Sequence, residues 1–180
     1  MAVLVAYASR HGSTAGIAER IAEVLTDAGV PAEARPVSRI DDLDEYDAFV
    51  IGAAAYITHW LKDAMSFVEH HRHLLAARPV WLFSSGPLGS ESIGADGKDP
   101  RESTRPKEFD ELADLLHPRD QKVFFGAWDP DAPPVGMAER MMKLAPAAAK
   151  SLPAGDFRDW NDIDAWATQI ARELAAPTRA

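Results

Sequence analysis

The sequence of 180 residues contains no cysteine, which excludes disulfide bonds, thiolate nucleophiles, thiolate metal sites and cysteine-held iron–sulfur clusters. It also lacks any apolar stretch near the roughly 20 residues that a membrane-spanning helix needs, so no transmembrane segment is expected. The first apolar run has the length of a strand and lacks the basic flank of a signal peptide. These absences predict a cytoplasmic protein.

Positive charge is also scarce, because 19 Lys and Arg residues stand against 28 Asp and Glu residues, for a net charge of −9. Such a surface repels nucleic acid, so nucleic-acid partners are not expected. The hydrophobic content of 47% is ordinary for a globular protein. A chain of this length can bury one good core and is short for two. We therefore expect a single domain over residues 1–180.

Five short apolar runs alternate with segments whose apolar residues follow helical spacing. This alternation predicts a parallel sheet covered by helices on both faces, a doubly wound α/β fold. The expected strands are residues 3–7, 32–37 (near a sheet edge), 47–52 (ended by Gly52), 79–83 and 122–128. Four helices are expected, and their residues predicted to face the core are, in chain order, Ile17 and Ile21; Leu61, Ala64, Met65 and Val68; Phe109, Leu112, Leu115 and Leu116; and Ile163, Trp166, Ile170 and Leu174.

Right-handed crossovers place every loop that follows a strand on the same edge of such a sheet. The loops at residues 9–14, 53–59 and 84–89 are therefore expected to converge near a topological switch point. These loops are rich in hydroxyl, glycine and aromatic residues. Residues 89–107 are polar and are expected to form a long exposed loop.

The loop at residues 9–14 has the features of a phosphate site. It carries three hydroxyls, the flexible Gly12 and the cation Arg10, with no carboxylate, and it opens a helix. Backbone N–H groups and the positive dipole end at a helix N-terminus favour a phosphate. The alternative is a polar turn that caps the helix, but a cap needs only one hydroxyl.

Other phosphate-binding and catalytic motifs do not match. The dinucleotide fingerprint needs G-x-G-x-x-G, but only Gly12 and Gly16 are present here. The nucleotide-hydrolysing P-loop motif and the nucleophile elbow G-x-S-x-G do not occur. The acids of a response-regulator receiver are missing from the ends of the first and third strands, where Ser9 and Gly52 stand.

The first loop resembles the flavodoxin signature, and the matching residues are Tyr7, Ser9, Gly12, Thr14, Ala18 and Ile21. The resemblance implies a flavodoxin-like fold with strand order 2-1-3-4-5, an insertion after strand five, and noncovalently bound FMN. The implied contacts to its phosphate are Ser9, Arg10, His11, Gly12, Ser13 and Thr14. The two later loops would flank the flavin ring through Ala54, Ala55, Tyr56, Ser85, Gly86, Pro87 and Leu88. Two interpretations stay open for His59 and Trp60: they contact the flavin, or they belong to the start of the following helix.

Scattered matches elsewhere are similar to the menaquinone-dependent protoporphyrinogen IX dehydrogenases. They are Gly52-Ala53 leading to Tyr56, Phe125-Gly126-Ala127, and Phe157 to Trp160. The resemblance implies a quinone acceptor, a porphyrinogen substrate and an insertion at residues 129–156. Within it, residues 135–150 include Arg140, Lys143 and Lys150 and three methionines, which suit peripheral membrane contact, substrate binding or plain packing.

Two classes of function stay open from the sequence. The chain is either an FMN oxidoreductase linked to a quinone or an electron carrier that docks on a redox partner protein through its acidic surface. A quinone or deazaflavin reductase on the same scaffold is a third possibility. No catalytic acid or base stands out. The run His70-His71-Arg72-His73 is interpreted as favourable charge at a helix C-terminus rather than as a metal site.

Overall fold

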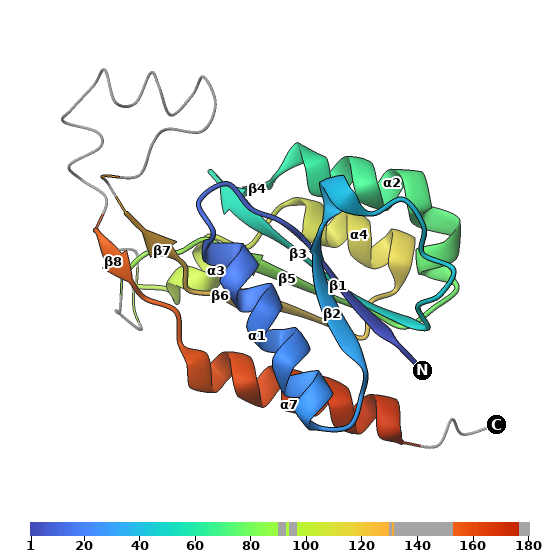
Figure 1. Cartoon of the computed structure of the whole chain (residues 1–180). Coiled ribbons are helices and arrows are strands. Elements are labelled where there is room, and N and C mark those ends of the chain that lie inside the picture. Colours follow the sequence, from blue (N-terminus) through green and yellow to red (C-terminus); the bar gives the residue numbers. More distant parts are fainter. Residues whose placement is uncertain (90–92, 94–96, 130, 132–152, 177–180) are drawn as a thin grey trace.

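The computed structural model describes residues 1–89, 93, 97–129, 131 and 153–176 (Figure 1). Its main sheet has parallel strands in the order β2-β1-β3-β5-β6, and the short strand β4 adds antiparallel to the end of β3. The strands are β1 (Val3–Ala8), β2 (Ala32–Pro36), β3 (Ala48–Tyr56), β4 (His59–Trp60), β5 (Val80–Ser85) and β6 (Asp120–Phe124). This confirms the predicted doubly wound order, with β2 at one edge.

Helices cover both faces of the sheet, because residues along each strand point alternately to opposite sides. Helices α1 (Ser13–Asp27) and α7 (Trp160–Ala175) lie on one face of the sheet (Figure 1). Val3 and Val5 pack with them there. Leu4 and Ala6 pack on the other face with α2 (Lys62–Ala76) and α4 (Glu108–Leu116). The described residues also form the shorter helical turns η1 (Val37–Arg39) and α3 (Pro100–Ser103). No helix among the described residues is long and apolar enough to cross a bilayer.

The third strand is longer than predicted, since it passes through Gly52 and ends at Tyr56. Glycine was interpreted as the end of this strand, but it has another role. A Cβ atom at Gly52 would lie 2.0 Å from the ring of Phe83 on the neighbouring strand. Gly52 therefore makes room for an aromatic ring in the core, and residues 53–56 belong to the sheet rather than to a loop.

The fifth parallel strand ends earlier than predicted, at Phe124. Gly126 donates its N–H to Pro87 O at 2.9 Å and accepts from Phe157 N at 3.0 Å, so the chain leaves the edge of the sheet there. It continues as β7 (Ala127–Trp128), which pairs antiparallel with β8 (Gly155–Asp156). The expected strand over residues 122–128 is thus two strands of two different sheets.

The region expected to be one long loop, residues 89–107, contains the short helix α3. Asp99 caps it by accepting from Arg101 N at 2.8 Å, and Pro100 occupies its first turn. Residues 90–92 and 94–96 lie outside the described residues, as do the predicted features of residues 135–150.

Candidate functional site

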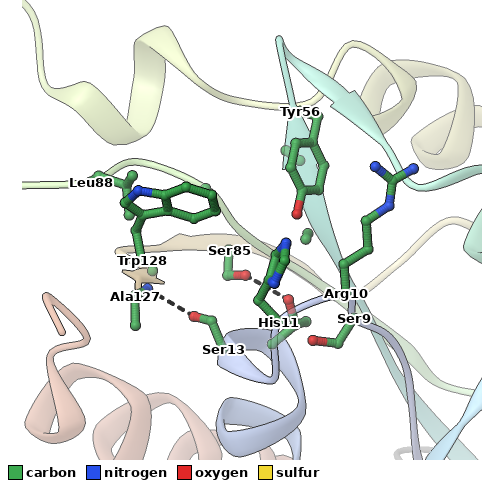
Figure 2. A pocket seen from close by; sticks show the side chains of 14 residues that line it. Ser9, Arg10, His11, Ser13, Tyr56, Ser85, Leu88, Ala127 and Trp128 are labelled. Carbon is green, nitrogen blue, oxygen red and sulfur yellow. Dashed lines mark hydrogen bonds between the residues drawn. The ribbon is translucent and has the colours of Figure 1, made fainter. Parts of the chain in front are cut away.

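A pocket lies at the edge of the sheet where β1, β3, β5 and β6 end (Figure 2). Its empty space is about 460 Å³, including the part open to solvent. The described lining residues are Ser9, Arg10, His11, Ser13, Thr14, Ala54, Ala55, Tyr56, Ser85, Gly86, Leu88, Gly126, Ala127 and Trp128. None of them carries a carboxylate.

The loop between β1 and α1 lines one side of the pocket. Gly12 adopts a left-handed conformation with φ of 81°, and its N–H donates to Ser9 Oγ at 3.1 Å. The helix then begins at Ser13 with no side-chain cap and no acid in its first turn. Uncapped N–H groups and the positive end of the helix dipole favour a phosphate there.

A buried hydroxyl pair joins this loop to the end of β5. Thr14 Oγ1 and Ser85 Oγ lie 2.7 Å apart, and both residues are buried. A hydroxyl has one proton to donate and two lone pairs that accept. If Ser85 donates to Thr14, the Thr14 proton is available to a phosphate oxygen, so the pair can orient a donor toward the loop.

Ser13 connects the same loop to β7. Its Oγ accepts from Ala127 N at 2.9 Å, as Figure 2 shows, while its carbonyl accepts from Arg158 Nη1 at 3.4 Å. Because the Ser13 hydroxyl accepts in this bond, its own proton can be donated elsewhere. The turn at Gly126 therefore brings β7 directly against the first turn of α1.

Two aromatic residues from different elements line the pocket. Tyr56, at the end of β3, has the guanidinium of Arg10 4.9 Å from its ring centre. Trp128, on β7, meets the ring of His11 edge-on at 5.5 Å. Figure 2 shows His11 between these two rings. Aromatic faces of this kind suit a flat conjugated ligand.

The structure brings most of the predicted site residues together. All of them line the pocket except Gly12, which shapes the loop, and Pro87, which is buried and accepts from Gly126 N. The prediction missed Gly126, Ala127 and Trp128, because they were assigned to a strand. Their signal was available, since the segment after the last parallel strand reaches the same edge as the other loops.

His59 and Trp60 are not among the described lining residues. His59 Nδ1 lies 2.8 Å from Glu108 Oε1, and Trp60 packs edge-on against Phe109 at 5.3 Å. The described residues contain no group of three or more His, Asp or Glu side chains arranged to hold a metal. On α2, His70 and His71 contact each other, and burial, followed by the charge of His70, lowers the pKa of His71.

Comparisons with known proteins agree with this geometry. The model of the flavodoxin domain family matches residues 4–144. Protoporphyrinogen IX dehydrogenase [quinone] from Escherichia coli K12 is 22% identical over 195 residues, covering 99% of both chains. An archaeal flavodoxin structure has a TM-score of 0.60 at 14% identity, covering 98% of this chain and all of the other. A flavodoxin from Pseudomonas aeruginosa has a TM-score of 0.59 at 16% identity, with the same coverage.

The pocket fits FMN, which combines one phosphate monoester with a flat, largely apolar ring. The uncapped start of α1 and its hydroxyls suit the phosphate, and none of the described lining residues brings a carboxylate that would repel it. Tyr56 and Trp128 offer aromatic surface to the ring. The family match and the fold indicate FMN as the cofactor. The chain therefore belongs to the flavodoxin domain family.

Proposed function

We propose that this protein is an FMN-dependent oxidoreductase that passes electrons from a reduced small molecule to a quinone, with a protoporphyrinogen as the reduced substrate. The observation that carries the proposal is the similarity to the E. coli quinone-linked dehydrogenase, which extends over 99% of both chains. For each quinone, two electrons and two protons leave the substrate and convert the quinone to a quinol.

In this proposal the residues of the chain bind and enclose the cofactor, and FMN supplies the capacity to accept and return electrons. The start of α1, with the hydroxyls of Ser9, Ser13 and Thr14, holds the phosphate. Tyr56 and Trp128 contact the ring and limit its access to water. The start of α1 and these hydroxyls fix the position of the cofactor, whereas the two aromatic residues also influence its redox potential through the polarity around the ring.

A second candidate function is that of an electron carrier without a small-molecule substrate. The net charge of −9 favours it, because an acidic surface steers the protein toward a basic redox partner. The first turn of α4 contributes Asp110 and Glu111 to that surface, and both side chains are exposed. In this alternative the partner is a protein rather than a quinone.

A steady-state assay with protoporphyrinogen IX and menaquinone distinguishes the two candidates. The oxidoreductase proposal predicts turnover that requires both compounds and stops when FMN is removed. The control is the same preparation with its FMN restored. Absence of quinone reduction, together with fast electron exchange with a flavodoxin reductase, would establish the carrier instead.

Residues 135–150 are the proposed contact with quinone or membrane, and this proposal rests on their sequence alone. Arg140, Lys143 and Lys150 suit anionic lipid headgroups, while the methionines offer apolar surface. Deleting the segment should abolish quinone reduction and association with anionic lipid vesicles but leave FMN binding intact. Unchanged quinone reduction and vesicle binding after the deletion would refute this role.

A further inference from the structure

The hairpin between β3 and β4 has an unusual turn. Ile57 and Thr58 join the two strands with φ of 51° and 61°, in the left-handed region. Both residues are β-branched, and such residues adopt this conformation only at a cost in conformational energy. Ile57 is also 92% exposed, so burial of its side chain does not compensate for this cost.

The N-terminal end of α4 holds this hairpin through both oxygens of one carboxylate. Glu108 Oε1 lies 2.8 Å from His59 Nδ1, and Glu108 Oε2 accepts from Trp60 N at 3.1 Å. Next to it, Lys107 N donates to Thr58 O at 3.0 Å. Three consecutive residues of the hairpin are thus bonded to Glu108, the first residue of α4, and to Lys107 directly before it.

The Glu108 carboxylate is well placed to form strong bonds. Its side chain is only 17% exposed, whereas that of His59 is 56% exposed. Burial alone would raise the pKa of Glu108, but hydrogen bonds from His59 and from backbone N–H groups outweigh burial and lower the pKa. The group is therefore ionised at neutral pH, and hydrogen bonds to an ionised acceptor are stronger than neutral ones.

The same hairpin carries one wall of the cofactor pocket. Tyr56 is paired with His59 across the two strands and lines the pocket, where Arg10 meets its ring. A shift of residues 57–60 is transmitted to Tyr56 through this pairing. The contact between α4 and the hairpin is therefore linked to Tyr56 through one strand pairing.

We propose that Glu108 is a positioning residue for the flavin site: by holding His59 and Trp60 it fixes the β3–β4 hairpin and keeps Tyr56 against the cofactor. The proposal deepens the proposed function and rests on its FMN site. Its test needs neither substrate nor quinone, so a failure of the dehydrogenase proposal would leave it standing.

The test compares Glu108→Ala, Glu108→Gln and His59→Gln with the control Glu111→Gln, which removes an exposed carboxylate from the same helix. Titration of the FMN-free protein should give a dissociation constant raised about 3- to 30-fold in Glu108→Ala, because two hydrogen bonds to a charged group are lost. Glu108→Gln should be milder, since its amide oxygen can still accept from Trp60 N. Glu111→Gln should stay within about twofold, as surface changes usually do.

The flavin midpoint potential provides a readout that a purely structural role would not move. It should rise in Glu108→Ala, because water that enters beside Tyr56 stabilises the negative charge gained on reduction. Hydrogen exchange of the Trp60 amide in the FMN-free protein should be faster in the same variant, since its acceptor is removed.

The proposal is overturned if Glu108→Ala matches Glu111→Gln in both FMN affinity and flavin midpoint potential. A change in amide exchange alone does not rescue it. If Glu108→Ala does not fold, the test uses Glu108→Gln, His59→Gln and the variant that combines these two substitutions. Effects on FMN affinity that are smaller in the double variant than the sum of the single ones support the proposal. Purely additive effects, or none, overturn it.

Discussion

The hydroxyl oxygens of Thr14 and Ser85 lie 2.7 Å apart in a buried hydrogen bond that joins the first turn of α1 to the end of β5. The two residues are 71 positions apart in the sequence. The bond therefore connects the proposed phosphate loop to the segment that flanks the proposed flavin site, and it should affect both stability and cofactor binding.

Replacing Thr14 by Val should weaken FMN binding by about tenfold and lower the free energy of unfolding by about 1–3 kcal/mol, because a phosphate donor is lost and Ser85 is left unpaired in the interior. Fluorescence titration and urea unfolding measure the two effects. The matched control is Thr26→Val at the other end of α1, where the hydroxyl donates to Ala22 O at 2.8 Å. This control should leave FMN affinity unchanged. Equal FMN affinities for the two variants would remove Thr14 from the site.

Two glycines allow backbone strain to be separated from cofactor binding. Gly12 and Gly29 both have left-handed φ, at 81° and 83°, and a Cβ atom at either would meet nothing within 4 Å. Alanine at each position should therefore cost about 1 kcal/mol of unfolding free energy through backbone conformation alone. Only Gly12→Ala should also weaken FMN binding, because it changes the loop at the start of α1. If Gly29→Ala reduced FMN affinity as much, the effect would be one of general stability.

Trp128 was not predicted as a site residue from the sequence, so replacing it tests whether the pocket lining seen in the structure binds FMN. Its Nε1–H is buried and has no hydrogen-bond partner among the described residues, so Trp128→Phe removes no hydrogen bond there and should bind FMN nearly as well. Trp128→Ala should raise the FMN dissociation constant about 3- to 10-fold through loss of the aromatic contact.

Tryptophan fluorescence gives an independent check on the same residue. FMN binding should quench much of the emission of Trp128, so Trp128→Phe should show less quenching than the unmodified protein. Trp160→Phe serves as the control, because Trp160 does not line the pocket. Identical quenching in both variants would show that Trp128 does not face the flavin.

An ion pair between α1 and α7 predicts a dependence of stability on pH. Arg20 Nη2 lies 2.6 Å from Asp164 Oδ2, and hydrogen bonding from Arg20 holds the pKa of Asp164 below its usual range. A carboxyl with a lowered folded-state pKa stabilises the protein above its unfolded pKa, about 3.9, and this contribution is lost as the pH falls further.

Arg20→Gln should therefore lower the midpoint of thermal unfolding at pH 7, and its difference from the unmodified protein should shrink below about pH 4. The effect should be modest, since the pair is partly exposed to solvent. Arg172→Gln on α7 removes the same charge from an exposed position and should change the midpoint less at pH 7. A difference between Arg20→Gln and the unmodified protein that grew in acid would contradict the assignment.

The parallel sheet and the loop that opens the first helix were predictable because their signals are local. The run from Val3 to Ala8 is apolar, and the hydroxyls of residues 9–14 stand directly before a helix whose inward residues repeat at helical spacing. Right-handed connections then place the loops at one edge without further information. Most of the pocket lining follows from these rules, whereas the strand order was implied by the resemblance to the flavodoxin signature.

The extent of β3 and the turn at Gly126 were not predictable in the same way. Gly52 continues its strand because the ring of Phe83, 31 positions later, occupies the space above it. Gly126 leaves the sheet because its N–H and C=O bond to Pro87 and Phe157. In both cases the partner is distant in the sequence, so no local pattern signals it.

The sequence by itself determined the class of fold, since the periodicity of its apolar residues depends on neighbouring positions, and its resemblance to the flavodoxin signature implied the kind of cofactor. The tertiary structure decided which of the described residues line the pocket. Trp128 reaches the pocket only because β7 turns away at Gly126, and Thr14 meets Ser85 only because β1 and β5 both lie beside β3. Contacts of this kind arise from packing between distant segments, which spacing along the chain does not encode.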